Sequence, residues 1–377
     1  MSLSLRISRN DFLAALSSLQ NVTGKKGTIA ILSNVLITTG NNSINITGTD
    51  LEVGIRIRVE AEILSEGSIT LPSKKLFEIV RESDSKTITL ELQKNNWVKI
   101  TADSTDYNLA GMEADEYPAF PEYHEDSLVE IDAEIIKDLI DKTIFSVAQE
   151  GESQFNLTGV LFEKIKKEDE KIYLRMISSD GHRLSFMENE VSDNIDKIEY
   201  ENSILIPKKG VNEIRKFCEG KDFIAMGFEK NQAVIKNDSS LMIIRLMNGD
   251  FPDYKNIIDV VNEDKFYVVK KENMINSMKR MNLFTEDRFN AVKFYIESGH
   301  LTLSSESMDI GNAKDEIKID YEGEVLTLGF NGRYFVDVLH VMSSDNIKVF
   351  INSDESPCLI KGDEDPGFLS VIMPMKI

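Results

Sequence analysis

The hydrophobic positions along the chain predict three copies of one mixed helix-and-strand unit. Each copy opens with a stretch in which apolar residues recur every three or four positions, which is the spacing of an amphipathic helix with one buried face. The three stretches are Ser8 to Val22, Asp132 to Ala148, and Lys271 to Phe284. They recur with a period of roughly 125–135 residues, which is too long for a solenoid and suits a domain.

Alternating segments follow each of these helices. The stretches LSNVLITTGNNSINITGTDLEVGIRIRV from Leu32, LTGVLFEKIKKEDEKIYLRMISSDGHRLSF from Leu157 and FNAVKFYIESGHLTLSSESMDIGNAKDEI from Phe289 each show an apolar strand, a polar turn and a second alternating strand. Each pattern predicts a β-hairpin after the helix.

A second helix is predicted after each hairpin, beginning near Leu71, Ile206 and Phe330. Ser73 and Asn331 are candidate N-caps, and Pro207 suits the start of a helix. Each copy then ends in another pair of alternating strands, as in Thr87 to Leu92 with Val98 to Thr101, and Ile347 to Ile351 with Leu359 to Lys361.

These elements predict an α+β fold of three repeated domains, each with two helices packed on antiparallel sheets. Polar segments near Pro121 to Ser127 and Asp259 to Lys265 place the boundaries, so the expected domains are 1–124, 125–262 and 263–377. The alternative is a chance recurrence of amphipathic elements.

Composition narrows the class of protein. The chain has 377 residues, of which 41% are hydrophobic and lie in short dispersed runs, so a globular protein is expected rather than a disordered or membrane-spanning one. The start MSLSLRISRNDF has no apolar signal region, and Cys218 and Cys358 cannot form a framework of bridges. A reducing cytoplasm is the expected location.

The usual catalytic motifs do not occur in the sequence, whether phosphate-binding loops, dinucleotide fingerprints, zinc-binding helices or nucleophile elbows. His182, in SSDGHRL beside Asp180 and Arg183, could be a general base, but it has no identifiable nucleophile partner and no metal-ligand spacing. A structural or peptide-binding role is therefore favoured. The acidic run Asp363, Glu364 and Asp365 is interpreted as a solvated loop. We expect no enzyme activity, no metal and no cofactor.

The net charge of −21 at first argues against a nucleic-acid partner, but the positive charge is concentrated. Residues 8–26 and 74–81 each carry +2, and residues 207–217 and 270–280 each carry +3, which leaves −31 on the rest of the chain. If these helical segments face one surface, that surface could bind phosphates without reading bases. Ordinary lysine-rich solvent faces remain the alternative.

Four motifs in order give the chain a resemblance to a known family: TGTDLE from Thr47, SSDGHRL from Ser178, GDFPDY from Gly249 and the terminal VIMPMKI from Val371. With the threefold repeat, the chain resembles the β subunit of bacterial DNA polymerase III, the replication sliding clamp. The resemblance implies a head-to-tail homodimeric ring of six similar domains, with helices lining the pore, that encircles double-stranded DNA and tethers the polymerase.

The resemblance also implies a pocket that accepts short linear peptides from the polymerase, the clamp loader and repair proteins. Carried over by motif, its residues are Leu157, Ser179, Gly181, His182, Arg183, Leu184, Pro252, Ile257, Tyr334, Val371, Met373, Pro374 and Met375. Without the family, VIMPM would be interpreted as a buried C-terminal strand.

The resemblance also implies DNA-contacting and dimer-forming residues. For DNA they are Lys25, Lys26, Gln154 and Phe155, to which the charge count adds Lys74, Arg81, Lys208 and Lys209; for the dimer they are Tyr107, Leu109, Leu283 and Phe284. The loop with Gln154 and Phe155 departs from the aromatic or arginine residues frequent in relatives, which leaves its DNA contact open. The four dimer residues could equally be core residues of their own domains.

Two other classes of function stay open on the sequence. One is a multi-domain peptide-binding scaffold without a DNA role. The other is a metal-dependent nuclease or a transferase, which would need clustered acidic residues in a cleft.

Overall fold

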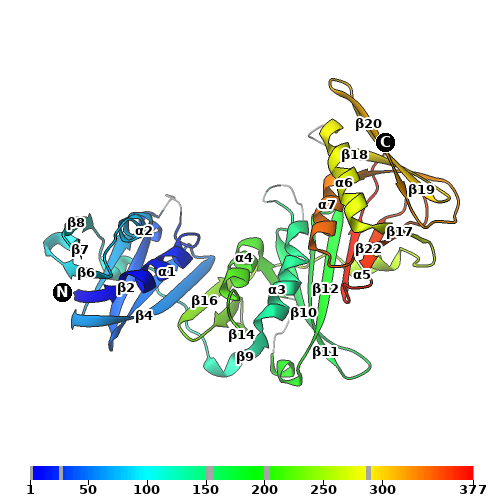
Figure 1. Ribbon diagram of the computed structural model, residues 1–377. Helices are drawn as coiled ribbons and strands as arrows, with labels where there is room; N and C mark the ends of the chain where they lie inside the picture. Colours follow the sequence, from blue (N-terminus) through cyan, green and yellow to red (C-terminus); the bar gives the residue numbers. More distant parts are fainter. Residues whose placement is uncertain are drawn as a thin grey trace. The chain divides into compact units, whose positions relative to one another are not determined.

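The structure is a computed structural model that describes residues 3–24, 29–149, 151, 156–198, 204–285 and 290–376 (Figure 1). The chain forms two compact units. The first contains residues 1–131, 197–200 and 223–246, and the second contains residues 132–196, 201–222 and 247–377. Each unit therefore takes part of the central repeat.

Each predicted repeat consists of two halves with the same order of elements, a strand, a helix and three strands. The first repeat has β1 (Ser4–Ser8), α1 (Arg9–Leu19), β2 (Asn34–Gly40), β3 (Ser43–Thr49), β4 (Val53–Ser65), β5 (Ser68–Pro72), α2 (Ser73–Arg81), β6 (Thr87–Leu92), β7 (Trp97–Ala102) and β8 (Thr105–Ala110). The second has β9 (Val129–Asp132), α3 (Ala133–Asp141), β10 (Gly159–Lys166), β11 (Ile172–Ser179), β12 (Arg183–Val191), β13 (Ile204–Pro207), α4 (Lys208–Phe217), β14 (Phe223–Glu229), β15 (Gln232–Lys236) and β16 (Ser240–Arg245).

The third repeat follows a connecting helix, α5 (Tyr254–Asp259). It has β17 (Phe266–Lys270), α6 (Lys271–Met281), β18 (Ala291–Glu297), β19 (His300–Ser307), β20 (Gly311–Lys318), β21 (Leu326–Asn331), α7 (Gly332–Val341), β22 (Asn346–Phe350), β23 (Cys358–Gly362) and β24 (Phe368–Ile372).

The six predicted amphipathic helices are confirmed, while the strand prediction was incomplete. Each predicted hairpin and each predicted closing pair of strands is in fact a three-stranded meander. The chain turns again at short segments such as residues 50–52 and 180–182, and a third strand follows the turn. Asn331 caps α7 by accepting a hydrogen bond from the Arg333 amide, as predicted. Ser73 was wrongly assigned as a cap. It lies inside α2, where its hydroxyl bonds Gln20 and Thr23 instead.

The third strand of one half-repeat pairs with the third strand of another, and this pairing joins successive repeats. In the first unit β4 pairs antiparallel with β16, and in the second unit β12 pairs antiparallel with β24. These strands are buried along most of their paired lengths, with Gly54 opposite Ile243 and Leu184 opposite Val371. Backbone hydrogen bonds thus continue from one repeat to the next.

β8 and β20 are likewise the last strands of their half-repeats but are edge strands, each paired on one side only among the described residues. Their residues are mostly exposed, unlike those of β16 and β24. Large apolar side chains near β20 face solvent, including Met308 at 95% and Leu283 at 71% exposure. Such an edge offers unpaired backbone groups to another chain.

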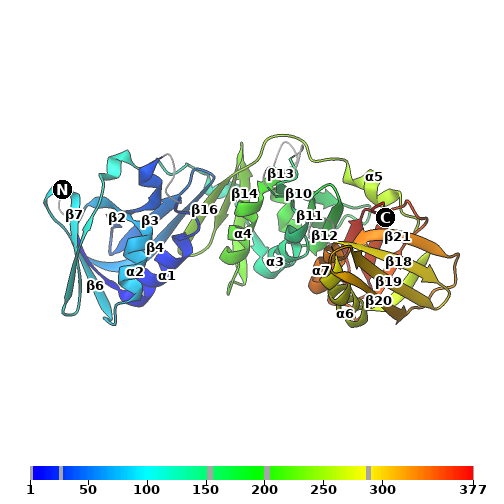
Figure 2. The ribbon, with the colours of Figure 1, turned by 90° about the horizontal axis from the view of Figure 1, so that it is seen from above.

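Two helices pack side by side in each repeat, α1 with α2, α3 with α4, and α6 with α7 (Figures 1 and 2). In the first repeat the Arg9 guanidinium donates to the carbonyls of Val80 and Arg81 at the end of α2. In the third, the Lys271 ammonium donates to the carbonyls of Met342 and Ser343 beyond α7. A cation at the start of one helix therefore neutralises the negative end of its neighbour.

A buried ion pair connects the second repeat to the third. The Lys142 ammonium at the end of α3 lies 3.0 Å from the Asp365 carboxylate in the turn between β23 and β24, and Asp365 is 2% exposed. Asp365 also accepts bonds from the Ser343 and Ser344 amides and the Ser344 hydroxyl. Burial alone would raise the pKa of Asp365, but these donors outweigh it and lower the pKa. The solvated-loop interpretation was therefore wrong for Asp365, although Asp363 and Glu364 are exposed.

We expect Asp365→Asn to lower the free energy of unfolding by about 3 kcal/mol, because it removes the nearer and fully buried of the two carboxylates that pair with Lys142, the other being Asp138 at 3.6 Å. Since the folded carboxyl has a lowered pKa, its contribution is complete above the ordinary aspartate pKa and is lost as pH falls through the folded value. Calorimetric unfolding between about pH 7 and pH 3 should therefore show a flatter acid limb in the variant. Asp363→Asn, at an exposed pair with Lys348, is the matched control and should change little. Equal effects of the two substitutions would contradict the assignment.

Candidate functional site

The SSDGHRL segment forms the turn between β11 and β12. The Ser179 hydroxyl accepts a bond from the Gly181 amide and donates to the Arg183 carbonyl. The Asp180 carboxylate accepts bonds from the amides of His182 and Arg183, both at 3.0 Å. Gly181 has a positive φ of 88°, which glycine adopts without steric cost. Two short polar side chains and one glycine therefore fix the shape of the turn.

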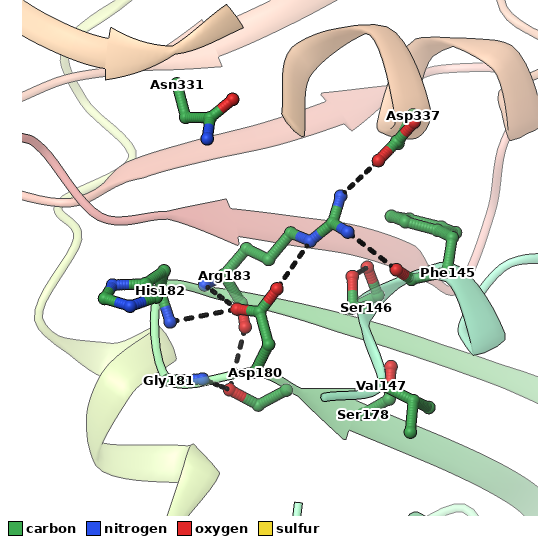
Figure 3. A network of polar contacts seen from close by, with 12 residues as sticks. Phe145, Ser146, Val147, Ser178, Asp180, Gly181, His182, Arg183, Asn331 and Asp337 are labelled. Atoms are coloured by element: carbon green, nitrogen blue, oxygen red, sulfur yellow. Dashed lines mark hydrogen bonds and ion pairs between the residues drawn. The ribbon is translucent and has the colours of Figure 1, made fainter. Parts of the chain in front are cut away.

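Arg183 connects this turn to two other segments (Figure 3). Its guanidinium donates to the Asp180 carboxylate at 3.0 Å, to the Asp337 carboxylate on α7 at 2.6 Å and to the Phe145 carbonyl at 2.7 Å. The same group lies 4.3 Å from the centre of the Tyr334 ring. Its side chain is only 9% exposed. Arg183 therefore holds the turn of the second repeat against α7 of the third.

The C-terminal tail runs beside this turn. The last strand, β24, pairs with β12, and the Met373 amide then donates to the His182 carbonyl at 2.8 Å. Farther on, the Met375 amide donates to the Gly329 carbonyl in β21. The predicted buried strand is confirmed as far as Ile372, but Met373 is 40% exposed. The tail thus presents apolar side chains to solvent on a fixed backbone.

A buried apolar cluster lies beneath the same surface. Leu184 and Val371 belong to it together with Phe186, and Phe251 and Ile257 pack against it while staying partly exposed. Partly exposed apolar side chains over a packed base can take the anchors of a short peptide.

Tyr254 anchors the GDFPDY segment, a role that the sequence analysis missed. Its hydroxyl donates to Glu163 at 2.6 Å and accepts from Arg175 at 2.9 Å, and its ring belongs to the buried cluster. Burial and the Glu163 carboxylate raise the pKa of Tyr254 to about 12. Arg175 also pairs with Glu188 at 2.8 Å. The only signal available in the sequence was the aromatic residue at the end of the motif.

The structure brings most of the predicted pocket residues together within the second unit. Leu157 lies under the turn, 4.0 Å from the position that a Cβ on Gly181 would occupy, and His182 is exposed at the tip. Pro252 lies two residues before Tyr254, the buried first residue of α5, and directly before the capping residue Asp253. Pro374 is partly exposed in the tail.

The predicted DNA residues occupy different environments. Lys74 is exposed on α2, and Arg81 is exposed beside Glu82. Lys208 is half-buried and donates to the Val147 carbonyl at 3.2 Å. Burial and then the Arg183 charge lower its pKa. Lys209 is partly exposed and interacts with another residue of the chain. Lys25, Lys26, Gln154 and Phe155 lie outside the described residues.

Part of the concentrated positive charge is neutralised locally. Arg215 pairs with Asp141, Lys216 with Glu213 and Arg280 with Asp315. Lys74, Lys270 and Lys279 are exposed and form no ion pair with a described residue. Within the described part of the four positive segments, these three lysines are exposed cations available to a phosphate.

The predicted dimer residues lie at the two edge strands. Tyr107 and Leu109 are partly exposed on one face of β8, and Leu283 and Phe284 lie next to β20, where the Phe284 ring approaches Gly311.

Among the described residues, no three His, Cys, Asp or Glu side chains lie close enough to hold a metal ion. No helix in the described ranges is long and apolar enough to cross a membrane.

These features describe a protein of serial α+β repeats, in which β8 and β20 are unpaired on one side among the described residues and an apolar surface lies beside the Asp180–Arg183 turn. Family models of the DNA polymerase III beta subunit match residues 3–121 (N-terminal domain), 130–253 (central domain) and 261–376 (C-terminal domain). The chain belongs to the DNA polymerase III beta subunit family.

Known relatives agree along the whole chain. The beta sliding clamp of Chlamydia pneumoniae is 30% identical over 98% of both chains, and that of Caulobacter vibrioides is 28% identical over 99% of this chain and 100% of its own. A solved sliding clamp of Bartonella birtlesii, with griselimycin bound, has a TM-score of 0.93 at 27% identity, with each chain covered completely. The Caulobacter crescentus clamp has a TM-score of 0.92 at 27% identity, with the same coverage.

We expect Arg183→Lys to lower the free energy of unfolding by about 2 kcal/mol, because an ammonium cannot bond Asp180, Asp337 and the Phe145 carbonyl in the same planar arrangement. Urea unfolding measures the difference. The control is Arg81→Lys at an exposed pair, which should change stability by less than about 0.5 kcal/mol. An Arg183→Lys variant as stable as the wild type would show that Arg183 does not hold the turn to α7.

Proposed function

We propose that this protein is the sliding clamp of its replication machinery. Two copies form a head-to-tail ring of six similar domains that encircles double-stranded DNA without sequence specificity and confers processivity on the replicative polymerase. The observation that carries the proposal is the pair of open edges, β8 and β20, at the position where β4, β16, β12 and β24 are joined.

Ring closure follows from using one junction repeatedly. The β20 strand of a second copy pairs with β8 of the first copy as β4 pairs with β16. This contact joins two different surfaces, so it is heterologous, and the ring closes when the rotations from repeat to repeat add up to a full turn. Tyr107 and Leu109 then face Leu283 and Phe284. Closure also removes both exposed edges from solvent.

The peptide site is the surface around the Asp180–Arg183 turn, α5 and the C-terminal tail. Apolar anchors of the polymerase, the clamp loader or repair proteins would contact Leu184, Ile257 and Val371 and the exposed Met373. Tyr334 and Arg183 support this surface from below. The griselimycin complex belongs to the Bartonella protein and supports a ligand site in the family.

The DNA contact is assigned to the phosphate backbone. Lys74 and Arg81 on α2 and Lys209 on α4 are exposed or partly exposed cations of the helix pairs. Lys208 contacts DNA only if its ammonium leaves the Val147 carbonyl. The remaining predicted contacts, Lys25, Lys26, Gln154 and Phe155, stay predictions.

Three further assignments accompany this function. The domains are 1–124, 125–262 and 263–377. The first two family-model segments, 3–121 and 130–253, lie within the first two bounds, and the third, 261–376, begins two residues before the third. The protein acts in the cytoplasm, where the chromosome is replicated. It performs no catalysis itself, because a processivity factor contributes binding and topology to the polymerase.

Retention on DNA of different topology tests the proposal. Protein loaded by its clamp loader on nicked circular plasmid should stay bound in about 0.5 M salt. Salt weakens the phosphate contacts, but a closed ring is retained on circular DNA by its topology and not by those contacts. Cutting the same plasmid once should release it within minutes as it slides off the ends, as followed by gel filtration. Equal retention on circular and linear DNA would contradict the ring.

The double variant Leu283→Ala with Phe284→Ala should weaken the dimer about ten-thousandfold, since it removes about 3 kcal/mol of apolar contact at each of the two β8–β20 contacts that close the ring. Sedimentation of the two proteins at equal concentration measures the shift toward monomer. Leu64→Ala with Phe223→Ala is the matched control, because it removes an exposed leucine and phenylalanine away from both edges. A variant that sediments like the wild type would place the dimer contact elsewhere.

A further inference from the structure

The turn between β3 and β4 has the same hydrogen bonds as the turn at Asp180–Arg183. The Thr49 hydroxyl accepts from the Leu51 amide and donates to the Val53 carbonyl, as Ser179 does with Gly181 and Arg183. The Asp50 carboxylate accepts from the amides of Glu52 and Val53 at 3.1 and 2.8 Å. The first unit therefore repeats the turn of the proposed peptide site.

The neighbouring strands repeat the arrangement in the same register. Val53 pairs with Ile244 as Arg183 pairs with Ile372, and Gly54 pairs with Ile243 as Leu184 pairs with Val371. One residue farther, Arg245 corresponds to Met373.

The connecting segments correspond as well. FPEY at Phe120–Tyr123 matches FPDY at Phe251–Tyr254, and both follow the last strand of a repeat. Phe120 packs against the buried residues Val234, Leu241 and Ile243, as Phe251 packs against the cluster beneath the proposed peptide site.

This junction contains a cavity of about 180 Å³ within the first unit. Leu51, Pro118, Phe120 and Ile243 supply its apolar lining, and Gln232 and Arg245 supply polar groups. The Phe120 ring lies 3.2 Å from where a Cβ on Gly54 would be, so glycine makes room for it. The volume suits one large side chain of a bound peptide.

Leu51 adopts a conformation that a leucine rarely takes. Its φ is +75°, in the left-handed region where Gly181 lies at the equivalent site, and its side chain is 50% exposed at the cavity. A bulky residue in this region is strained, and strain of this kind concentrates at ligand sites. Neither burial nor backbone geometry explains leucine here, whereas contact with a ligand does.

Arg245 determines the charge of that ligand. Its side chain is exposed at the cavity and makes no ion pair with a described residue. Glu52 also lines the cavity, but it already interacts with another residue of the chain. We propose that this cavity is a second peptide-docking site, which binds a short extended segment carrying a large apolar side chain next to a carboxylate. The comparison of the two junctions rests on the proposed function, while the cavity, Leu51 and Arg245 do not.

The test uses the full-length protein and a fluorescein-labelled, amidated pentapeptide of sequence Gly-Leu-Phe-Asp-Gly. Its binding stoichiometry and dissociation constants are measured by anisotropy with wild type, with Arg245→Glu, and with a chain lacking residues 373–377. We expect two peptides per chain on the wild type and one on each variant. A probe with lysine in place of aspartate should lose at least tenfold affinity for the site that the deletion spares.

The outcomes separate the two proposals. One peptide per chain, lost on deletion and unaffected by Arg245→Glu, overturns the second site and leaves the first. Loss of the only bound peptide in Arg245→Glu, with no effect of the deletion, supports the second site and overturns the first. No binding to the wild type overturns the second site with this chemistry.

Leu51→Gly supplies an independent readout, because glycine adopts a φ of +75° without strain. We expect it to weaken the deletion-resistant binding at least tenfold while the melting temperature stays equal or rises. Leu51→Asn, which also tolerates this region, should behave alike. A lowered melting temperature with unchanged binding would show that Leu51 serves the fold, and would overturn its role in the site.

Discussion

The pairing of one strand edge with another is the interaction on which the rest of this structure depends. Every half-repeat ends with a three-stranded meander whose last strand has an unpaired side, and exposed backbone amides and carbonyls at such an edge attract another strand. Within the chain, four of these last strands pair with each other, β4 with β16 and β12 with β24. The remaining two edges, β8 and β20, are unpaired on one side among the described residues, and under the proposed function a second copy pairs with them.

The two proposed peptide sites both lie at junctions between repeats. A turn, a last strand and a connecting segment meet at each junction, and their backbones are fixed by Ser179 and Asp180 in one unit and by Thr49 and Asp50 in the other. Because hydrogen bonds hold the backbone, the side chains on it can differ. Apolar groups surround one turn, and Leu51 with Arg245 occupies the other.

The positions of the charged residues on the helices say more about this protein than its net charge does. The net charge of −21 describes the whole chain, whereas the helix pairs carry cations that serve different purposes. Arg9 and Lys271 neutralise the ends of neighbouring helices, and Arg215 pairs with Asp141. Lys74 is exposed on α2, and the proposed function gives such lysines weak contacts with DNA phosphates.

The sequence predicted the elements whose pattern is local and missed the contacts that depend on distant partners. Apolar spacing located the six amphipathic helices, and Asn331 was identified from its place before α7. The burial of Asp365 was not predictable, since its partner Lys142 is 223 residues away. Arg183 was selected by motif, but its bond to Asp337, 154 residues away, gives it its role at the site.

Hydrogen exchange of β8 (Thr105–Ala110) and β20 (Gly311–Lys318) tests whether a second copy covers these edges. If it does, their amides are protected at micromolar concentration as strongly as those of the β4–β16 junction, and dilution below the dimer dissociation constant removes protection from these two strands alone. Rapid exchange of both strands at every concentration would contradict closure of the assembly through them.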